Sequence, residues 1–287
     1  MRILLTGSAG MVGRALAGHC AALGDEVFAH DRHSLDITNP DQVAVAFDRE
    51  RPEAIINCAA WTDVDACESA PQRAHAIHAG AVETLARNSR RHNAAFVTIS
   101  TDYVFDGEKE GFYTQRDDPH PQGVYAVSKL AGERLARDAY ARAVVARTSW
   151  VFGHGGSNFL SRVVDLARAG QPLKAINDAY GTPTYASHLA GRVRELAARD
   201  LPGVYHVTNS GAGATFEEFA RAALAIANCS DAQIESVSLD SLRRPAPRPR
   251  NSRLRCLLSE AIGLAPLPDW QAALTEFIAE RETRSAE

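Results

Sequence analysis

Lysine is nearly absent from this chain of 287 residues: its 31 lysine and arginine residues are all arginine except Lys109, Lys129 and Lys174. Arginine is a rigid fork that stays protonated, whereas lysine is a compact charge whose pKa is easily tuned. A position that needs only a cation would therefore be arginine in this chain, so each lysine is informative. Lys129 follows Tyr125 by four residues, a spacing that places two side chains on one face of a helix.

Other features are also missing, and each absence excludes a class of protein. The opening apolar run, MRILLTG, is too short for a signal peptide or a membrane span, so we expect no membrane partner. The net charge of −4 lacks the basic surplus of nucleic-acid-binding proteins. The five cysteines form no C-x-x-C pair, which indicates reduced thiols in a cytoplasmic protein. No carboxylate cluster shows metal-ligand spacing, and we expect no metal.

The first half of the chain alternates short apolar runs with segments of helical spacing. Strands are predicted over residues 2–6, 26–29, 54–58, 95–100 and 143–147. Helices are predicted over residues 11–23, 40–50 and 72–91, and around Tyr125 and Lys129. Strict alternation implies right-handed crossovers and therefore an α/β fold with a doubly wound, Rossmann-like parallel sheet.

The pattern loosens after about Val151. Helices are predicted over residues 158–169, 189–199, 216–228 and 270–281, and a strand over 204–207 can return to the sheet. We interpret residues 1–152 as a dinucleotide-binding domain, with a return segment near 178–210. Residues 153–177 and 211–287 would form a smaller, discontinuous α/β substrate-binding lobe over the carboxyl ends of the strands.

A glycine-rich turn, GSAGMVG at residues 7–13, joins the first predicted strand to the first helix. Such a turn lets the backbone approach a pyrophosphate, which then faces the helix N-terminus. The sequence therefore predicts NADPH or NADH binding; the alternative is a glycine-rich turn without a ligand. The cofactor-binding candidates in this turn are Gly7, Gly10, Met11, Val12 and Gly13.

The ends of the second and third strands supply further cofactor candidates. Asp31, 18 residues after Gly13, would accept hydrogen bonds from a ribose diol and favours NAD, whereas Arg32 could meet a 2′-phosphate and favours NADP. The choice between them stays open. The other candidates are Asp36 and Ile37, which border the adenine or only form a turn, and Ala59 and Ala60, which admit the cofactor or only pack tightly.

Three residues predict the chemistry. Thr101 ends the fourth strand, and ligands of doubly wound sheets bind at the carboxyl ends of the strands. Thr101 could hold a carbonyl while Tyr125 delivers a proton, its pKa lowered by the Lys129 ammonium. Lys129 could also hold the nicotinamide ribose, which completes a hydride-transfer site. The alternative is a surface tyrosine beside a solvated lysine.

The motifs of this sequence resemble those of the extended short-chain dehydrogenases/reductases. Within that superfamily they resemble the dTDP-4-dehydrorhamnose reductase family. The glycine turn and the Tyr125/Lys129 pair are typical of the whole superfamily. Narrower strings run along most of the chain: NCAAWTDVDACE at 57–68, STDYVF at 100–105, RTSW at 147–150, DAYGTPT at 178–184 and RNSRL at 250–254.

The resemblance implies an enzyme that reduces the C4 ketone of a nucleotide-linked 4-keto-6-deoxy sugar, with dTDP-4-dehydro-β-L-rhamnose favoured. It implies Thr101, Tyr125 and Lys129 as catalytic residues. Tyr103 stands where related 4,6-dehydratases carry the glutamate that helps to eliminate water, which favours ketone reduction. The substrate-binding candidates are Thr62, Asp63, Thr101, Asp102, Trp150, Arg250 and Asn251.

Some of these candidates have a purely structural alternative. Trp150 could be a core aromatic, and Thr62 with Asp63 could form a solvated loop. Six arginines interleave with prolines over Arg243–Arg255; they could form a solvated basic loop, or Arg250 and Asn251 could meet the diphosphate, since arginine suits phosphate geometry.

Two questions of assembly and function stay open. Some relatives form a magnesium-bridged dimer through a glutamate just beyond the third glycine, where this chain has Arg14, so we expect a monomer or a homodimer without a metal bridge. A non-catalytic subunit resembling the methionine adenosyltransferase β-subunit is one alternative function, against which the intact Thr101, Tyr125 and Lys129 argue. A reductase of a different nucleotide sugar is the other, because the nucleotide base and the sugar stereochemistry are not fixed by the sequence.

Overall fold

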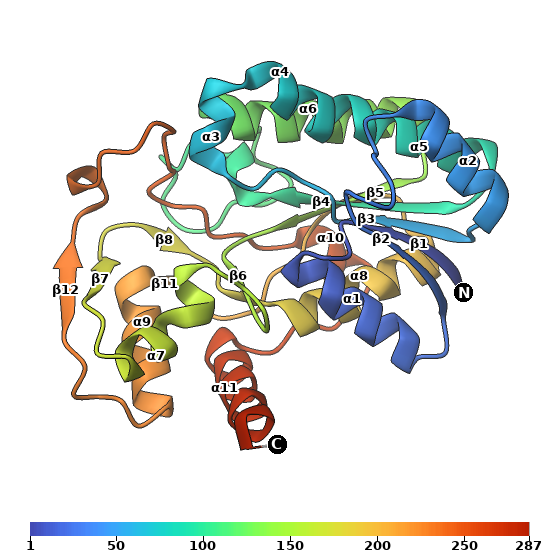
Figure 1. Cartoon of the computed structure of the whole chain (residues 1–287). Helices are drawn as coiled ribbons and strands as arrows, with labels where there is room; N and C mark the ends of the chain where they lie inside the picture. Colours follow the sequence, from blue (N-terminus) through green and yellow to red (C-terminus); the bar gives the residue numbers. More distant parts are fainter. Residues whose placement is uncertain (287) are drawn as a thin grey trace.

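The computed structural model describes residues 1–286 and centres on a parallel sheet of six strands (Figure 1). The strand order is β10-β5-β4-β3-β1-β2. The first five strands follow the predicted pattern, and the returning strand pairs in parallel with β5. Their bounds are Arg2–Thr6 (β1), Glu26–His30 (β2), Ala54–Asn57 (β3), Ala95–Thr101 (β4), Ala143–Thr148 (β5) and Gly203–His206 (β10). The doubly wound α/β fold is confirmed.

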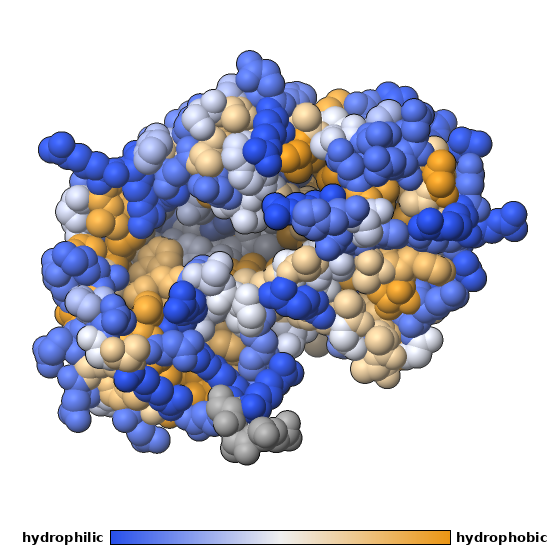
Figure 2. Space-filling view, in the orientation of Figure 1, coloured by the Kyte–Doolittle hydropathy of each residue, from blue (hydrophilic) through white to orange (hydrophobic). Residues whose placement is uncertain are grey.

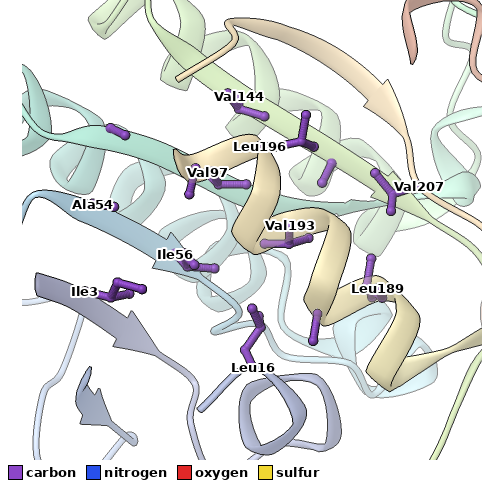
Figure 3. Packing of buried hydrophobic residues seen from close by; sticks show 14 of the residues in the cluster. Ile3, Leu16, Ala54, Ile56, Val97, Val144, Leu189, Val193, Leu196 and Val207 are labelled. Atoms are coloured by element: carbon purple, nitrogen blue, oxygen red, sulfur yellow. The ribbon is translucent and has the colours of Figure 1, made fainter. Parts of the chain in front are cut away.

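Helices cover both faces of this sheet because its strands are apolar on both sides. On one face α1 (Met11–Ala22) and α8 (Ala186–Arg199) pack against the sheet, and Figure 3 shows Leu16, Val193 and Leu196 over the strands. The opposite face of the sheet is covered by α2 (Pro40–Glu50), α5 (Ala81–Arg91) and α6 (Gly123–Ala139).

The helix predicted over residues 72–91 is observed with one irregularity. It consists of α4 (Pro71–His75), a π-helical turn η1 (Ala76–Gly80) and α5. A short helix α3 (Val64–Ser69), which the sequence did not indicate, precedes it, and a 3-10 turn η2 (Asp102–Val104) follows β4. Asn39 is the N-cap of α2, because its side chain accepts from the Asp41 and Gln42 amides.

The second half of the chain builds a separate apolar cluster around Phe152 and Tyr185. Its helices, α7 (Phe159–Arg168), α9 (Phe216–Ile226) and α11 (Trp270–Ala286), match the predicted segments. The remaining elements are short and were not predicted: β6 (Val151–Phe152), β7 (Leu173–Ile176), β8 (Tyr180–Gly181), β9 (Thr184–Tyr185), β11 (Ala214–Thr215), β12 (Ile234–Val237), η3 (Leu239–Ser241) and α10 (Leu257–Ala261). The residue bounds expected for a domain and a lobe stay a prediction.

Candidate active site

The glycine-rich turn between β1 and α1 leaves no room for side chains. Gly7 has a φ of +71°, and a Cβ on it would lie 2.6 Å from the Ala59 nitrogen. A Cβ on Gly13 would lie 2.2 Å from the Gly7 carbonyl oxygen. Gly10 caps α1 without a side-chain hydrogen bond, and the first turn of α1, which starts at Met11 and Val12, has no acidic residue. The free N–H groups and positive end of α1 therefore fit a dinucleotide pyrophosphate.

The residues after β2 are partly used by the protein itself. Asp31 Oδ1 accepts the amides of His33 and Ser34, each at 2.9 Å, and these hydrogen bonds lower the pKa of Asp31. Asp36 Oδ1 accepts both the amide and the hydroxyl of Thr38.

Two neighbours of these turns differ in exposure. Ile37 is buried in the core, whereas the Arg32 side chain is exposed beside Asp31. Turn formation and packing thus account for Asp36 and Ile37 without a ligand, and Arg32 keeps an exposed guanidinium.

The third strand ends against the glycine turn. Asn57 accepts the Thr6 hydroxyl at 2.6 Å and the Ala59 amide at 3.2 Å, and donates to the Thr98 hydroxyl at 3.0 Å. These bonds fix the backbone where Ala59 faces Gly7. Ala60 follows, half-buried. The two alanines therefore lie where the sequence placed them, at the mouth of the predicted cofactor site.

Thr101 and Tyr125 meet at the carboxyl end of β4. Thr101 ends that strand and Tyr125 lies in the first turn of α6. Burial raises the pKa of the Tyr125 phenol, and the Thr101 side chain is near enough to oppose that effect in part. The Thr101 hydroxyl also donates to Asp102 Oδ1 at 3.0 Å, and Asp102 Oδ2 accepts the Ser149 hydroxyl at 2.7 Å. Asp102 is buried, and burial raises its pKa. The Asp102 side chain therefore holds the Thr101 hydroxyl in place.

The expected effect of Lys129 on Tyr125 is wrong for the free protein. Burial, followed by the charge of Asp102, raises the pKa of the Tyr125 phenol, and Lys129 is not among the causes of the shift. The Lys129 ammonium instead donates to the Ile99 carbonyl oxygen at 2.7 Å. Burial lowers the pKa of Lys129 to about 8. A raised pKa keeps Tyr125 protonated, which is the state that a proton donor needs.

His78 is a site residue that the sequence reasoning missed. Its Nε2 accepts the Trp61 amide at 2.9 Å, and its Nδ1 lies 2.9 Å from the Ser128 hydroxyl, which donates to the Tyr125 carbonyl oxygen. Its ring also meets the Tyr125 ring edge to face. Burial lowers the pKa of His78 to about 3, so the imidazole is neutral. Only the π-helical turn η1 brings it here, and no sequence signal revealed that turn.

Trp150 lies in an unusual backbone conformation between β5 and β6. Its φ is +45°, a region that bulky residues rarely occupy unless the surroundings enforce it. The indole stacks on Phe216, with 3.8 Å between ring centroids, and a Cβ on Gly181 would collide with it. This geometry supports a ligand contact as well as a packing role for Trp150.

The other predicted sugar contacts are at the surface near α3. Thr62 and Asp63 are exposed, and Asp63 Oδ1 accepts the Ala66 amide at 3.0 Å, which caps α3. Two residues after Asp63, Asp65 pairs with both terminal nitrogens of Arg248. Burial raises the pKa of the Tyr103 phenol, and the nearby charge of Arg248 opposes that effect in part. The arginine-proline segment is thereby anchored beside the Thr101–Tyr125 pair.

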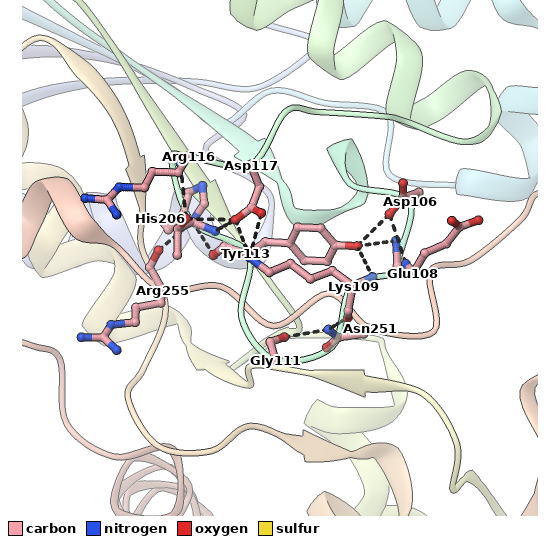
Figure 4. A network of polar contacts seen from close by, with 12 residues as sticks. Asp106, Glu108, Lys109, Gly111, Tyr113, Arg116, Asp117, His206, Asn251 and Arg255 are labelled. Atoms are coloured by element: carbon pink, nitrogen blue, oxygen red, sulfur yellow. Dashed lines mark hydrogen bonds and ion pairs between the residues drawn. The ribbon is translucent and has the colours of Figure 1, made fainter.

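The two diphosphate candidates have protein partners. Arg250 pairs with Asp178 at 3.0 Å and with Asp240. The Asn251 side-chain amide donates to the carbonyl oxygens of Lys109 and Gly111 and so holds the loop over residues 109–111 (Figure 4). Arg250 keeps about half of its side chain exposed, at 49%. Figure 2, in the orientation of Figure 1, shows a hollow in the surface between the regions of β4 and β8.

Two kinds of feature are absent from the described residues, 1–286. Within that range, no group of three or more His, Cys, Asp or Glu side chains is arranged to hold a metal ion. None of the helices there has both the length and the apolar character to cross a membrane. At the position where metal-bridged dimers carry glutamate, Arg14 donates to the Gly155 carbonyl oxygen at 2.9 Å and also contacts Ala9.

Comparisons with known proteins match nearly the whole chain. The family model described as "RmlD substrate binding domain" matches residues 1–283. A "dTDP-4-dehydrorhamnose reductase" of Streptomyces griseus is 37% identical and covers 96% of this chain, with 92% of its own length matched. The E. coli (strain K12) reductase of that name is 35% identical over the full length of both chains.

Solved structures agree in fold. The dTDP-4-dehydrorhamnose reductase of Bacillus anthracis, crystallised in complex with NADP, superposes with a TM-score of 0.93 at 32% identity. The match covers 97% of this chain and 99% of that chain.

Proposed function

This chain belongs to the RmlD substrate-binding-domain family, which includes proteins named dTDP-4-dehydrorhamnose reductase, and we propose that it is an NADPH- or NADH-dependent reductase. It acts on the C4 ketone of a nucleotide-linked 4-keto-6-deoxy sugar, with dTDP-4-dehydro-β-L-rhamnose as the favoured substrate and dTDP-L-rhamnose as the product. One observation carries the proposal: Thr101, the Tyr125 phenol and the buried Lys129 come together at the carboxyl end of β4, in a sheet whose first turn fits a dinucleotide.

The residues that would hold the cofactor are those of the glycine turn, with Asp31 and Arg32 at its ribose end. Lys129 would hold the nicotinamide ribose. When bound, the nicotinamide cofactor supplies the hydride that the ketone carbon accepts. Because the first turn of α1 has no side-chain cap at Gly10 to compete with a ligand, the protein contributes binding and orientation at this end of the site.

Tyr125 supplies the proton. Reduction of the ketone carbon leaves negative charge on the C4 oxygen, and the Tyr125 O–H gives its proton to that oxygen while the O–H bond breaks. Thr101 positions the phenol and the carbonyl oxygen through its own hydroxyl. The raised pKa of Tyr125 ensures that the proton is present when it is needed.

Tyr103 supports reduction over dehydration. Elimination of water needs a base, and burial raises the pKa of the Tyr103 phenol to about 12, so it stays neutral. A neutral phenol is a poor substitute for the glutamate that dehydratases use. Trp150, with its enforced backbone conformation, is the substrate-binding candidate that the geometry supports best. The weaker candidates either make contacts within the protein that explain them or have no polar partner that points to a ligand. They are Thr62, Asp63, Asp102, Arg250 and Asn251.

The direct test is consumption of NADPH or NADH with enzymatically prepared dTDP-4-dehydro-β-L-rhamnose. A panel of other nucleotide-linked keto sugars, assayed in parallel, fixes the nucleotide base and the stereochemistry. We expect turnover with the rhamnose precursor and identification of the 4-hydroxy product by mass spectrometry. Folded protein that binds the cofactors and reduces none of these sugars would overturn the proposal. Stoichiometric recovery of a partner enzyme with that inactive protein would favour the regulatory-subunit alternative.

A further inference from the structure

A buried ion pair lies one helical turn beyond Lys129. Arg147 of β5 donates to both carboxylate oxygens of Glu133 on α6, at 2.6 Å and 2.9 Å. Both side chains are buried, with 7% and 4% exposed. Removing such charges from water is costly, and replacing a buried pair by apolar groups is often neutral or stabilising. Stability alone is therefore a weak reason for this pair to be here.

The pair is connected to the catalytic strand. Glu133 also accepts the Ser100 hydroxyl, and Lys129 donates to the carbonyl oxygen of Ile99. Two side chains spaced four residues apart on one face of α6 thus hold the two residues that precede Thr101. Arg147 lies opposite Ser100 in the β4–β5 register. Tyr125, Lys129 and Glu133 repeat at this same spacing, so one helix face carries the acid, the ammonium and the carboxylate.

Glu133 is the carboxylate that acts on Lys129. Cys58 after β3 and Glu133 of α6 act on Lys129, and Lys129 acts on His78 of η1. Arg147 of β5 engages Glu133. Burial raises the pKa of Cys58 to about 12 and lowers that of His78 to about 3, so both are neutral. Asp102 acts on Tyr125. Burial favours a neutral Lys129, and the charge of Glu133 opposes that effect.

We propose that Glu133 is a positioning residue that keeps the Lys129 ammonium charged and locks α6 in register with Thr101, and that Arg147 holds the Glu133 carboxylate in place for this role. The functional part of this inference rests on the reductase role proposed for Lys129. The structural part does not, because it concerns the charge of Lys129 in the free protein.

The scarcity of lysine makes a direct test possible. Protein labelled with ¹³C at lysine Cε gives signals from Lys109, Lys129 and Lys174 only. The Lys129→Met variant lacks the Lys129 signal and so identifies it in the wild-type spectrum. The titration of each ammonium is followed by NMR in three proteins: wild type, Glu133→Gln, and the double variant Glu133→Gln/Arg147→Met. The matched control is Glu235→Gln, which removes the exposed carboxylate partner of Lys174, 2.9 Å away.

The double variant decides the outcome because it leaves no unpaired buried charge. We expect Glu133→Gln to lower the melting temperature, since Arg147 loses its partner, and the double variant to recover much of it. In both, the Lys129 titration midpoint moves to lower pH by about one pH unit, the effect of losing a nearby opposite charge. In the Glu235→Gln control the Lys129 midpoint does not move.

An unchanged Lys129 midpoint in the folded double variant overturns the proposal. Kinetics gives a second readout: the alkaline limb of kcat/KM moves to lower pH with the NMR midpoint. A lower kcat/KM with an unmoved limb would show a purely structural role and would also overturn it. Because the NMR titration uses no substrate, failure of the proposed reductase activity leaves this test intact.

Discussion

The rings of Tyr103 and Tyr125 meet edge to face, with 6.1 Å between their centroids and 88° between their planes. Burial raises the pKa of both phenols. Their polar neighbours differ, because Thr101 acts on the Tyr125 phenol and Arg248 on the Tyr103 phenol. Two neighbouring phenols in similar surroundings therefore have different expected roles: Tyr125 faces the reacting oxygen, and Tyr103 anchors the arginine-proline segment.

The glycine turn gives the first prediction. Gly13→Ala places a Cβ against the Gly7 carbonyl oxygen, and backbone must move to admit it. We expect the dissociation constant for NADPH to rise about tenfold or more, as about 1.4 kcal/mol of strain would produce. Fluorescence titration of the cofactor measures this change.

Gly18→Ala on the same helix is its control, because nothing lies within 4 Å of the added Cβ. That variant should bind NADPH normally, and its helix gains up to about 1 kcal/mol from alanine. Equal affinity for NADPH in the Gly13→Ala and Gly18→Ala variants would argue that the turn does not approach the cofactor.

The second prediction concerns the choice between NADPH and NADH. One carboxylate oxygen of Asp31 is occupied by backbone amides, whereas the Arg32 guanidinium is exposed beside it. We expect Arg32→Ala to raise the KM for NADPH roughly thirtyfold, since a charge-assisted hydrogen bond contributes about 2 kcal/mol. The KM for NADH, measured in the same assay, should change little. Equal changes for both cofactors would exclude Arg32 as the reader of the 2′-phosphate.

The third prediction is a loss of stability in acid. Burial lowers the pKa of His78 and of His206 from 6.5 to about 3. Between these values the unfolded chain binds more protons than the folded one, so the free energy of unfolding falls as pH falls below 6.5. Each histidine contributes a slope of up to about 1.4 kcal/mol per pH unit.

Denaturant unfolding at several pH values measures that slope for wild type, His78→Gln and His206→Gln. Each variant should show a shallower dependence on pH than wild type. Variants with the wild-type slope would show that the two imidazoles are not held neutral in the folded protein.

The sequence predicted the sheet well for a physical reason. Strands buried on both faces, such as Ala54–Asn57, consist of apolar runs, and the helices between them are long enough to show their period. The two-residue strands of the second half are different, because β8, β9 and β11 exist only through pairing with distant segments. No local pattern predicts such pairs.

The site was predictable where chemistry restricts the residue type, and less so where a long-range contact decides its role. Thr101 and Tyr125 were singled out because few residue types can hold a carbonyl oxygen or donate a proton, and their catalytic roles stay predictions. His78 was missed because it lies in a π-helical turn, which the spacing of apolar residues did not indicate. In that turn its ring contacts Tyr125 and the Trp61 amide. Asn251 looked like a ligand contact, yet its amide holds the carbonyl oxygens of Lys109 and Gly111, some 140 residues away in the chain.

The most direct test of the account compares Tyr125→Phe with Tyr103→Phe. Each substitution removes one buried phenol hydroxyl and leaves the aromatic ring in place. We predict that Tyr125→Phe lowers kcat with the 4-keto sugar by about 10²- to 10⁴-fold, the usual contribution of a positioned proton donor, with an unchanged dissociation constant for NADPH. Tyr103→Phe, which leaves Thr101 and Tyr125 intact, should lower kcat by no more than about tenfold. Wild-type kcat in Tyr125→Phe would contradict the account.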